Sequence, residues 1–198
     1  MEVYPSKLYN KLEDNYHLSN KKALFLNMRN YYEALSVDPF SVLPLTFHIK
    51  TGLDDPEFAH FVQHYESNKD KTWIIKPGEN TNRGIGISVS KDFDEIKSLI
   101  EESTRSKKKT CIVQKYISNP LLINKRKFDI RTYALLCSVN GNLRGFYYEE
   151  GYLRTSCREY SNQNLSNKLV HLTNDAIQKN AAEYGKYETG NKLSYAEF

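Results

Sequence analysis

The most informative part of the chain is the stretch Trp73-Ile74-Ile75-Lys76-Pro77-Gly78, a short apolar run that ends on a lysine and a proline. After a polar loop rich in glycine and asparagine, Arg83-Gly84-Ile85-Gly86-Ile87 opens a second apolar run. Two such runs predict a β-hairpin whose connection carries glycine and arginine. An ammonium at the end of a buried strand is costly without a partner, and a phosphate is one partner that would hold it there.

Other interpretations of this hairpin compete with phosphate binding. A single lysine more often reaches solvent past a following proline, and a glycine-rich loop more often serves structure than binding. The loop is not a Walker A motif, and no His-Arg-Asp segment of a kinase follows downstream. Gly84 and Gly86 nevertheless permit backbone amides to approach a phosphate chain, and Arg83 can add charge-assisted hydrogen bonds.

The segments around the hairpin alternate between helix and strand patterns. Apolar residues at helical spacing predict helices over 20–35, from Asp54 or Asp55 onward, and over 93–100. Cys111-Ile112-Val113 is apolar throughout, as expected for a strand buried on both faces. The chain therefore combines helices with short strands.

A different pattern begins at Lys127, where charge alternates with period two. Lys127, Asp129 and Arg131 are expected on one face of a strand, with Phe128 and Ile130 packed on the other. A solvated outer face would explain the charges equally well. Asn140-Gly141 then predicts a tight antiparallel hairpin, because both residues tolerate a positive φ. His171, taken alone, is more often a satisfied core histidine than a catalyst.

Composition sets wide bounds. The 198 residues suffice for one domain or two small ones, and 39% hydrophobic content is enough for a core. A net charge of +4 favours an acidic partner without requiring nucleic acid, and the basic cluster Arg105 with Lys107, Lys108 and Lys109 is most simply a solvated helix end. The three cysteines lack metal-ligand or disulfide spacing. We expect neither a nucleic-acid nor a membrane partner.

Taken together, these motifs resemble the tubulin-tyrosine ligase and ligase-like family, whose members have an ATP-grasp fold. The resemblance covers about two thirds of the chain and rests on seven segments in order: Trp73 to Pro77, Arg83 to Ile87, Gln114 to Ile117, Lys127 to Arg131, Gly151 to Ser156, His171 to Asn174, and Tyr184 to Tyr187 before Gly190-Asn191. It implies an α/β (α+β) chain with antiparallel sheet and flanking helices. The implied division is an N-terminal helical segment (1–50), a central subdomain with the glycine-rich loop (51–117) and the first part of a C-terminal subdomain (118–198).

The resemblance also implies roles for individual residues. Phosphates would be held by Lys76, Arg83 and Gly84, and the adenine hinge would be lined by Gln114, Lys115, Tyr116 and Ile117. Lys127 and Asp129 would contact the nucleotide, with Phe128 between them in the same cofactor-binding segment. Arg131 and Arg154 would be the catalytic residues that stabilise a carboxylate or a phosphoryl group in transit, and Thr173 and Asn174 would complete the pocket. Lys22 is the candidate for a lysine that the family uses from its N-terminal region.

The implied activity is ATP-dependent ligation of an amino acid to a protein carboxylate through an acyl phosphate. The expected partners are the acidic C-terminal tail of tubulin and a free amino acid, with tyrosine, glutamate and glycine all open. ATP and Mg²⁺ are the implied cofactors, and the family's metal ligands would follow Phe198, so we expect an ATP-grasp domain that is incomplete at its C-terminus. The alternative is a catalytically incomplete module that binds nucleotide or an acidic tail. The expected location is the cytoplasm, including the cytoskeleton or a cilium.

Overall fold

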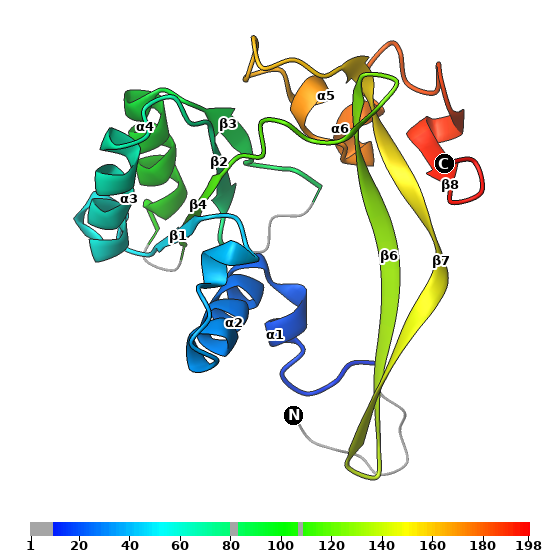
Figure 1. Ribbon diagram of the computed structural model, residues 1–198, viewed down its shortest axis with the longest axis horizontal. Coiled ribbons are helices and arrows are strands. Elements are labelled where there is room, and N and C mark those ends of the chain that lie inside the picture. Colours follow the sequence, from blue (N-terminus) through cyan, green and yellow to red (C-terminus); the bar gives the residue numbers. More distant parts are fainter. Residues whose placement is uncertain (1–9, 80–82, 107–108) are drawn as a thin grey trace.

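The computed structural model describes residues 10–79, 83–106 and 109–198, and these form an α+β protein with two antiparallel sheets (Figure 1). The helices of the described residues are α1 (Tyr16–Ser19), α2 (Lys21–Ala34), η1 (Pro39–Ser41), η2 (Gly52–Asp54), α3 (Pro56–Glu66), α4 (Phe93–Thr104), α5 (Lys168–His171), α6 (Asp175–Gln178) and η3 (Thr189–Asn191). The strands are β1 (Thr46–Ile49), β2 (Trp73–Pro77), β3 (Ser88–Ser90), β4 (Cys111–Lys115), β5 (Leu122–Ile123), β6 (Arg126–Val139), β7 (Asn142–Glu159) and β8 (Lys192–Ser194).

The first sheet has the strand order β1-β4-β2-β3, and every neighbouring pair in it is antiparallel. Helices α3 and α4 pack on one face and bury the main core, in which Phe61 meets Trp73 edge to face with ring centroids 5.0 Å apart. Both helices begin at an aspartate: Asp55 accepts from the Glu57 amide at 2.9 Å, and Asp92 accepts from the Glu95 amide at 2.8 Å. Such caps satisfy amides that the helix leaves unpaired.

The helix and strand predictions for this half of the chain are confirmed. The helix expected over 20–35 is α2, which begins where Asn20 accepts from the Lys22 and Ala23 amides. The strand expected at Cys111 is β4, whose first three residues are buried. The predicted hairpin is the β2–β3 pair, although β3 is shorter than the run from Gly84 to Val89. Its tip at 80–82 lies outside the described residues, as do Lys107 and Lys108 of the basic cluster.

The second sheet has the order β5-β6-β7-β8 and is dominated by the long β6–β7 hairpin (Figure 1). Its turn is the expected one, with φ of 50° at Asn140 and 76° at Gly141. The prediction that the face of Phe128 and Ile130 is packed is wrong for Ile130, which is 52% exposed. The hairpin extends beyond the helices that cover its base, so the side chains on its outer part are mostly exposed.

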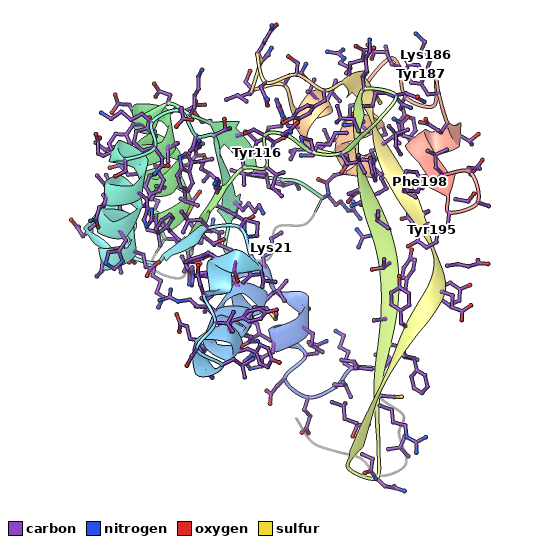
Figure 2. All side chains as sticks on the ribbon, in the orientation of Figure 1. Lys21, Tyr116, Lys186, Tyr187, Tyr195 and Phe198 are labelled. Carbon is purple, nitrogen blue, oxygen red and sulfur yellow. The ribbon has the colours of Figure 1, made fainter. Side chains whose placement is uncertain are left out.

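A buried ion pair joins the segment before β8 to this sheet. Arg126 is 2% exposed and forms two hydrogen bonds with the Glu188 carboxylate, which also accepts from the Thr155 hydroxyl at 2.8 Å. Burial alone would raise the pKa of Glu188, but the bonds from Arg126 and Thr155 lower it. Cζ of Arg126 lies over the Tyr187 ring, 4.2 Å from the ring centroid. Figure 2 labels Tyr187 near the base of the hairpin. The Tyr184 to Tyr187 motif thus lies against the base of the hairpin.

The predicted division at residues 50 and 117 remains a prediction. In the structure, β1 from the first of the three segments pairs with β4 from the second, and residues 118–198 contribute all of the second sheet. Near the end of the chain, Ser194 and Glu197 form a reciprocal pair of hydrogen bonds of the capping-box type: Ser194 Oγ accepts from the Glu197 amide, and Glu197 Oε2 accepts from the Ser194 amide.

Candidate functional site

The face of the first sheet opposite α3 and α4 carries the first cluster of predicted site residues. Lys76 on β2 donates from Nζ to Oε1 of Gln114 on β4 at 2.7 Å, and the Gln114 amide donates onward to the Thr46 hydroxyl at 2.8 Å. These three residues line a cavity of about 270 Å³ together with Lys21 and Phe25 of α2. The alternation of a strand explains the arrangement, because Ile75 and Val113 point into the core while their neighbours point here.

Lys76 is mostly buried, and its ammonium is electrostatically unfavourable in this place. Burial, with Lys21 and Lys127 nearby, lowers the pKa of Lys76 from 10.5 to about 8. Among the described residues, no carboxylate forms an ion pair with it. Lys76 is therefore a mostly buried cation without an ion-pair partner in the part of the chain that the structure describes.

The end of β4 and the segment after it form a hinge in which one backbone amide is free to donate a hydrogen bond to a ligand. The Lys115 amide donates to the Leu45 carbonyl at 2.8 Å, and the Tyr116 amide donates to the Thr72 carbonyl at 2.9 Å. Within the described residues, the Ile117 amide has no such partner. Of the four predicted hinge residues, Gln114 lies within the strand ladder and the Lys115 and Tyr116 amides are paired, so Ile117 is the one whose N–H can read a base edge.

The side chain of Tyr116 joins the two sheets. Its hydroxyl lies 3.0 Å from Nζ of Lys127 on β6 and 2.9 Å from Nδ1 of His171 on α5. Lys127 also donates to the His171 carbonyl at 3.1 Å. Burial lowers the pKa of Lys127, and the charge of Asp129 offsets only part of this effect. Lys127, like Lys76, has no ion pair with a carboxylate in the part of the chain that the structure describes.

Asp129 and Arg154 face each other across the β6–β7 pair. Arg154 donates from Nε to Oδ1 of Asp129 at 2.8 Å and makes a second bond from Nη2 to Oδ2. The hydrogen bond to Asp129 raises the pKa of Arg154. This two-point contact fixes the plane of the guanidinium. Phe128 points to the opposite face, where its ring lies 5.5 Å from that of Phe198, so its side chain is not part of the cluster.

A second cavity, of about 510 Å³, brings together residues from three separate parts of the chain. It is lined by Arg83 of the glycine-rich loop, by Arg131 and Arg154 of the hairpin, and by the segment Asn174 to Ala176 with Lys179 at α6. The one carboxylate among these residues belongs to Asp175, and it accepts from the Tyr184 hydroxyl at 2.5 Å. Four cationic side chains around one carboxylate suit an anionic ligand.

Gly84 holds the loop against this second cavity. Its φ is 80°, and a Cβ at this position would lie 2.5 Å from Cδ1 of Ile177 and 3.0 Å from Oδ1 of Asn174. The positive φ therefore favours glycine, and any larger residue would also force the Ile177 and Asn174 side chains to shift. Arg83 also has a positive φ, of 63°. The contact places the loop beside α6.

The structure thus brings most of the predicted site residues into two adjoining clusters. Lys76, Gln114, Tyr116 and Lys127 form the first, and Arg83, Gly84, Arg131, Arg154 and Asn174 form the second, with Asp129 close to both through Lys127 and Arg154. Thr173 is buried next to Asn174. The side chains of Lys115, Ile117 and Phe128 lie outside both clusters; Lys115 is exposed on the opposite face of β4 from Gln114.

Three residues near the clusters were not predicted for these places. Lys22 instead pairs with Glu79 at 2.5 Å, and it is the preceding Lys21 that lines the cavity beside Lys76. Lys179 lines the second cavity, and His171 binds Tyr116. Helical phase could have distinguished Lys21 from Lys22 only if the position of α2 over the sheet were known.

The described residues contain no group of three or more His, Cys, Asp or Glu side chains that could hold a metal ion. Protein side chains alone therefore form no complete Mg²⁺ site in this part of the chain, and the ligands expected after Phe198 remain a prediction. In the same part of the chain, no helix combines the length and apolarity needed to cross a membrane.

Comparison with known proteins identifies the family. The model of the tubulin-tyrosine ligase family matches residues 1–198. Tubulin glycylase 3D of Tetrahymena thermophila is 39% identical over 79% of this chain and 14% of its own length. The probable alpha-tubulin polyglutamylase Ttll1 of the same organism is 30% identical over 93% of this chain and 48% of its own. Tubulin glycylase 3B of Drosophila melanogaster is 41% identical over 54% of this chain and 14% of its own length.

The chain therefore spans about half the length of one of these relatives and about a seventh of the other two. The match to the family model covers the whole chain, and the α+β architecture with antiparallel sheets agrees with the ATP-grasp-like fold of that family. This protein belongs to the tubulin-tyrosine ligase family.

Proposed function

We propose that this chain is part of an ATP-dependent ligase that adds an amino acid to a carboxylate of tubulin, as the names of its relatives suggest. The observation that carries the proposal is the pair of mostly buried ammonium groups of Lys76 and Lys127, which have no carboxylate partner among the described residues. A buried cation is stable only when something compensates its charge. The phosphates of a nucleotide supply that compensation.

The residues around these lysines fit a nucleotide in other respects. The free amide of Ile117 can donate to a base, and the Gln114 carboxamide keeps the Lys76 side chain in place. Gly84 brings the backbone of its loop close to Asn174 and Ile177, beside the adjoining second cavity. When bound, ATP would supply the phosphoryl group that converts the acceptor carboxylate into an acyl phosphate, from which the amine of the incoming amino acid displaces phosphate.

Arg131 and Arg154 are the residues to which we assign stabilisation of the reacting carboxylate. Both line the 510 Å³ cavity next to the lysine cluster, and Arg154 is held by its two bonds to Asp129. Preorganised cations of this kind stabilise charge that develops during transfer, without reorganising at that moment. The excess of positive charge around the cavity also suits an acceptor tail that is rich in glutamate.

The test is incorporation of labelled glycine, glutamate or tyrosine into tubulin, in the presence of ATP and magnesium, by a longer chain that contains these residues and the metal ligands expected after Phe198. Two of the relatives named above are glycylases and one is a probable polyglutamylase, so we expect glycine or glutamate to be incorporated before tyrosine. Arg131→Ala should abolish incorporation while leaving the fold intact, as judged by circular dichroism. Binding of ATP without incorporation of any amino acid would replace this proposal with a nucleotide-binding module.

A further inference from the structure

His171 lies at the centre of a buried cluster that joins three of the elements forming the site. The residue is 2% exposed on α5 and contacts Tyr116, which follows β4, while Lys127 of β6 contacts its carbonyl oxygen. The Tyr160 ring closes the cluster and packs edge to face against the imidazole, with centroids 5.6 Å apart. The sequence pattern favours a satisfied core histidine in this place, and the hydrogen bonds indicate a more specific role.

The two ring nitrogens of His171 have different partners, which determine the tautomer. Nε2 lies 3.0 Å from the carbonyl oxygen of Asn164, and because a carbonyl only accepts, Nε2 must carry hydrogen. Burial lowers the pKa of His171; the charge of Lys127 adds to this effect, and the bond to Asn164 opposes it. The neutral ring leaves Nδ1 as an acceptor, and the Tyr116 hydroxyl at 2.9 Å is its donor.

The direction of these bonds decides what Tyr116 can do for Lys127. Because its own proton is donated to His171, the Tyr116 oxygen is available to accept from Lys127 Nζ at 3.0 Å. The His171 carbonyl accepts a second N–H of the same ammonium at 3.1 Å. Donation thus runs in one direction, from Lys127 through Tyr116 and His171 to Asn164, and successive bonds of such a chain strengthen one another.

We propose that His171 and the Tyr116 hydroxyl are positioning residues that orient the Lys127 ammonium and leave one of its three N–H groups for a phosphate. The proposal rests on the nucleotide-binding function proposed above. An unrestrained lysine has four rotatable bonds in its stem, and holding it in one geometry before binding removes that entropy cost from the binding step. The Tyr116 side chain thereby contributes to the site independently of the hinge backbone.

A double-mutant cycle on ATP binding tests this role. We expect Tyr116→Phe, which removes one oxygen atom, to weaken ATP binding about tenfold by calorimetry, since a hydrogen bond to a charged group is lost. In a Lys127→Met background the same change should have no further effect. Tyr65→Phe is the matched control, because the Tyr65 hydroxyl donates to the Lys91 carbonyl at 2.8 Å and lies outside both clusters; it should keep the affinity of the unchanged chain. Unchanged affinity in Tyr116→Phe, or losses that multiply in the double variant, would overturn the proposal.

Two variants of His171 separate positioning from folding. His171→Asn can keep an acceptor near the position of Nδ1, whereas His171→Gln can keep a donor near Nε2 and lose that acceptor. With both variants folded by circular dichroism, the asparagine variant should retain more of the ATP affinity than the glutamine variant. Equal losses would show that His171 serves only the core.

Nitrogen NMR of the imidazole provides a readout that does not depend on nucleotide. We expect a neutral His171 ring with hydrogen on Nε2 at pH 7, and an imidazolium or the other tautomer would contradict the order of donors. If the unchanged chain binds no ATP, the proposed function and this role for Lys127 fall together. If it binds ATP while Tyr116→Phe matches it, the positioning role falls alone.

Discussion

Binding of ATP at pH 9 should take up a proton from solvent, and Lys76 should be the residue that gains it. Burial and two nearby lysines lower the pKa of Lys76 from 10.5 to about 8. At pH 9 the side chain is therefore mostly neutral in the free protein. A phosphate beside it favours the charged form, so binding and protonation become coupled.

The size of the effect follows from the shift. With a pKa of about 8, roughly 0.9 of the Lys76 side chains are neutral at pH 9 and roughly 0.1 at pH 7. If a bound phosphate restores the ordinary lysine pKa of 10.5, Lys76 takes up about 0.9 proton at pH 9 and about 0.1 proton at pH 7. The lowered pKa means that this environment, mainly through burial, disfavours the protonated form of Lys76 by about 3 kcal/mol. Lys127, whose pKa is also lowered by burial, adds a further share.

Calorimetry in buffers with different ionisation enthalpies measures this uptake directly, as the slope of apparent binding enthalpy against buffer enthalpy. Lys76→Arg is the matched control, because a guanidinium stays charged at both pH values and has no proton to gain. We expect the variant to bind ATP with only the uptake that belongs to Lys127. Equal uptake by the variant and the unchanged chain, or no difference between pH 7 and pH 9, would refute the assignment of the proton to Lys76.

Three further perturbations test the site and its frame. Lys76→Met should raise the free energy of unfolding by about 1–3 kcal/mol at pH 7, since it removes a buried uncompensated charge. This advantage should shrink between pH 8 and 10.5, where the unfolded chain binds more protons than the folded one; urea denaturation that shows a less stable variant at pH 7 would contradict it. Glu188→Gln should lower stability by about 3–5 kcal/mol, because Arg126 is left buried without its carboxylate, and a loss below 1 kcal/mol would show that the pair is dispensable. Gly84→Ala should reduce ATP affinity at least about fivefold through the strain of a positive φ and the contact with Ile177, so an unchanged dissociation constant would remove the loop from the site.

Local patterns were sufficient to predict much of the fold. The spacing of apolar residues predicted α2. The start of α3 was predicted from Asp55 and Pro56, which are typical of the beginning of a helix. Asn140-Gly141 predicted the turn of the long hairpin, because that signal depends only on the backbone freedom of two residues. The exposure of Ile130 could not be predicted in this way, because it depends on how far the covering helices reach along β6.

The candidate site shows the same limit. The resemblance named Lys76, Gln114 and Lys127. The side chains of Lys76 and Gln114 meet because the neighbouring strands β2 and β4 present alternate residues to one face, whereas Lys127 approaches from β6 of the second sheet. The resemblance could not show that Lys21 rather than Lys22 faces the cavity, since both precede the apolar stripe of the same helix. It named His171 only as the start of a matching segment and gave it no role, because that role depends on a partner 55 positions earlier in the chain.

Equilibrium dialysis with labelled ATP and magnesium tests most directly whether the two buried ammonium groups form a nucleotide site. We expect the unchanged chain to bind one ATP, and Lys76→Met and Lys127→Met each to weaken binding more than about tenfold, in line with the loss of a charge-assisted bond. Lys91→Met, at an exposed lysine outside both clusters, should bind as the unchanged chain does. No binding by the unchanged chain, or full binding by both site variants, would contradict the nucleotide site.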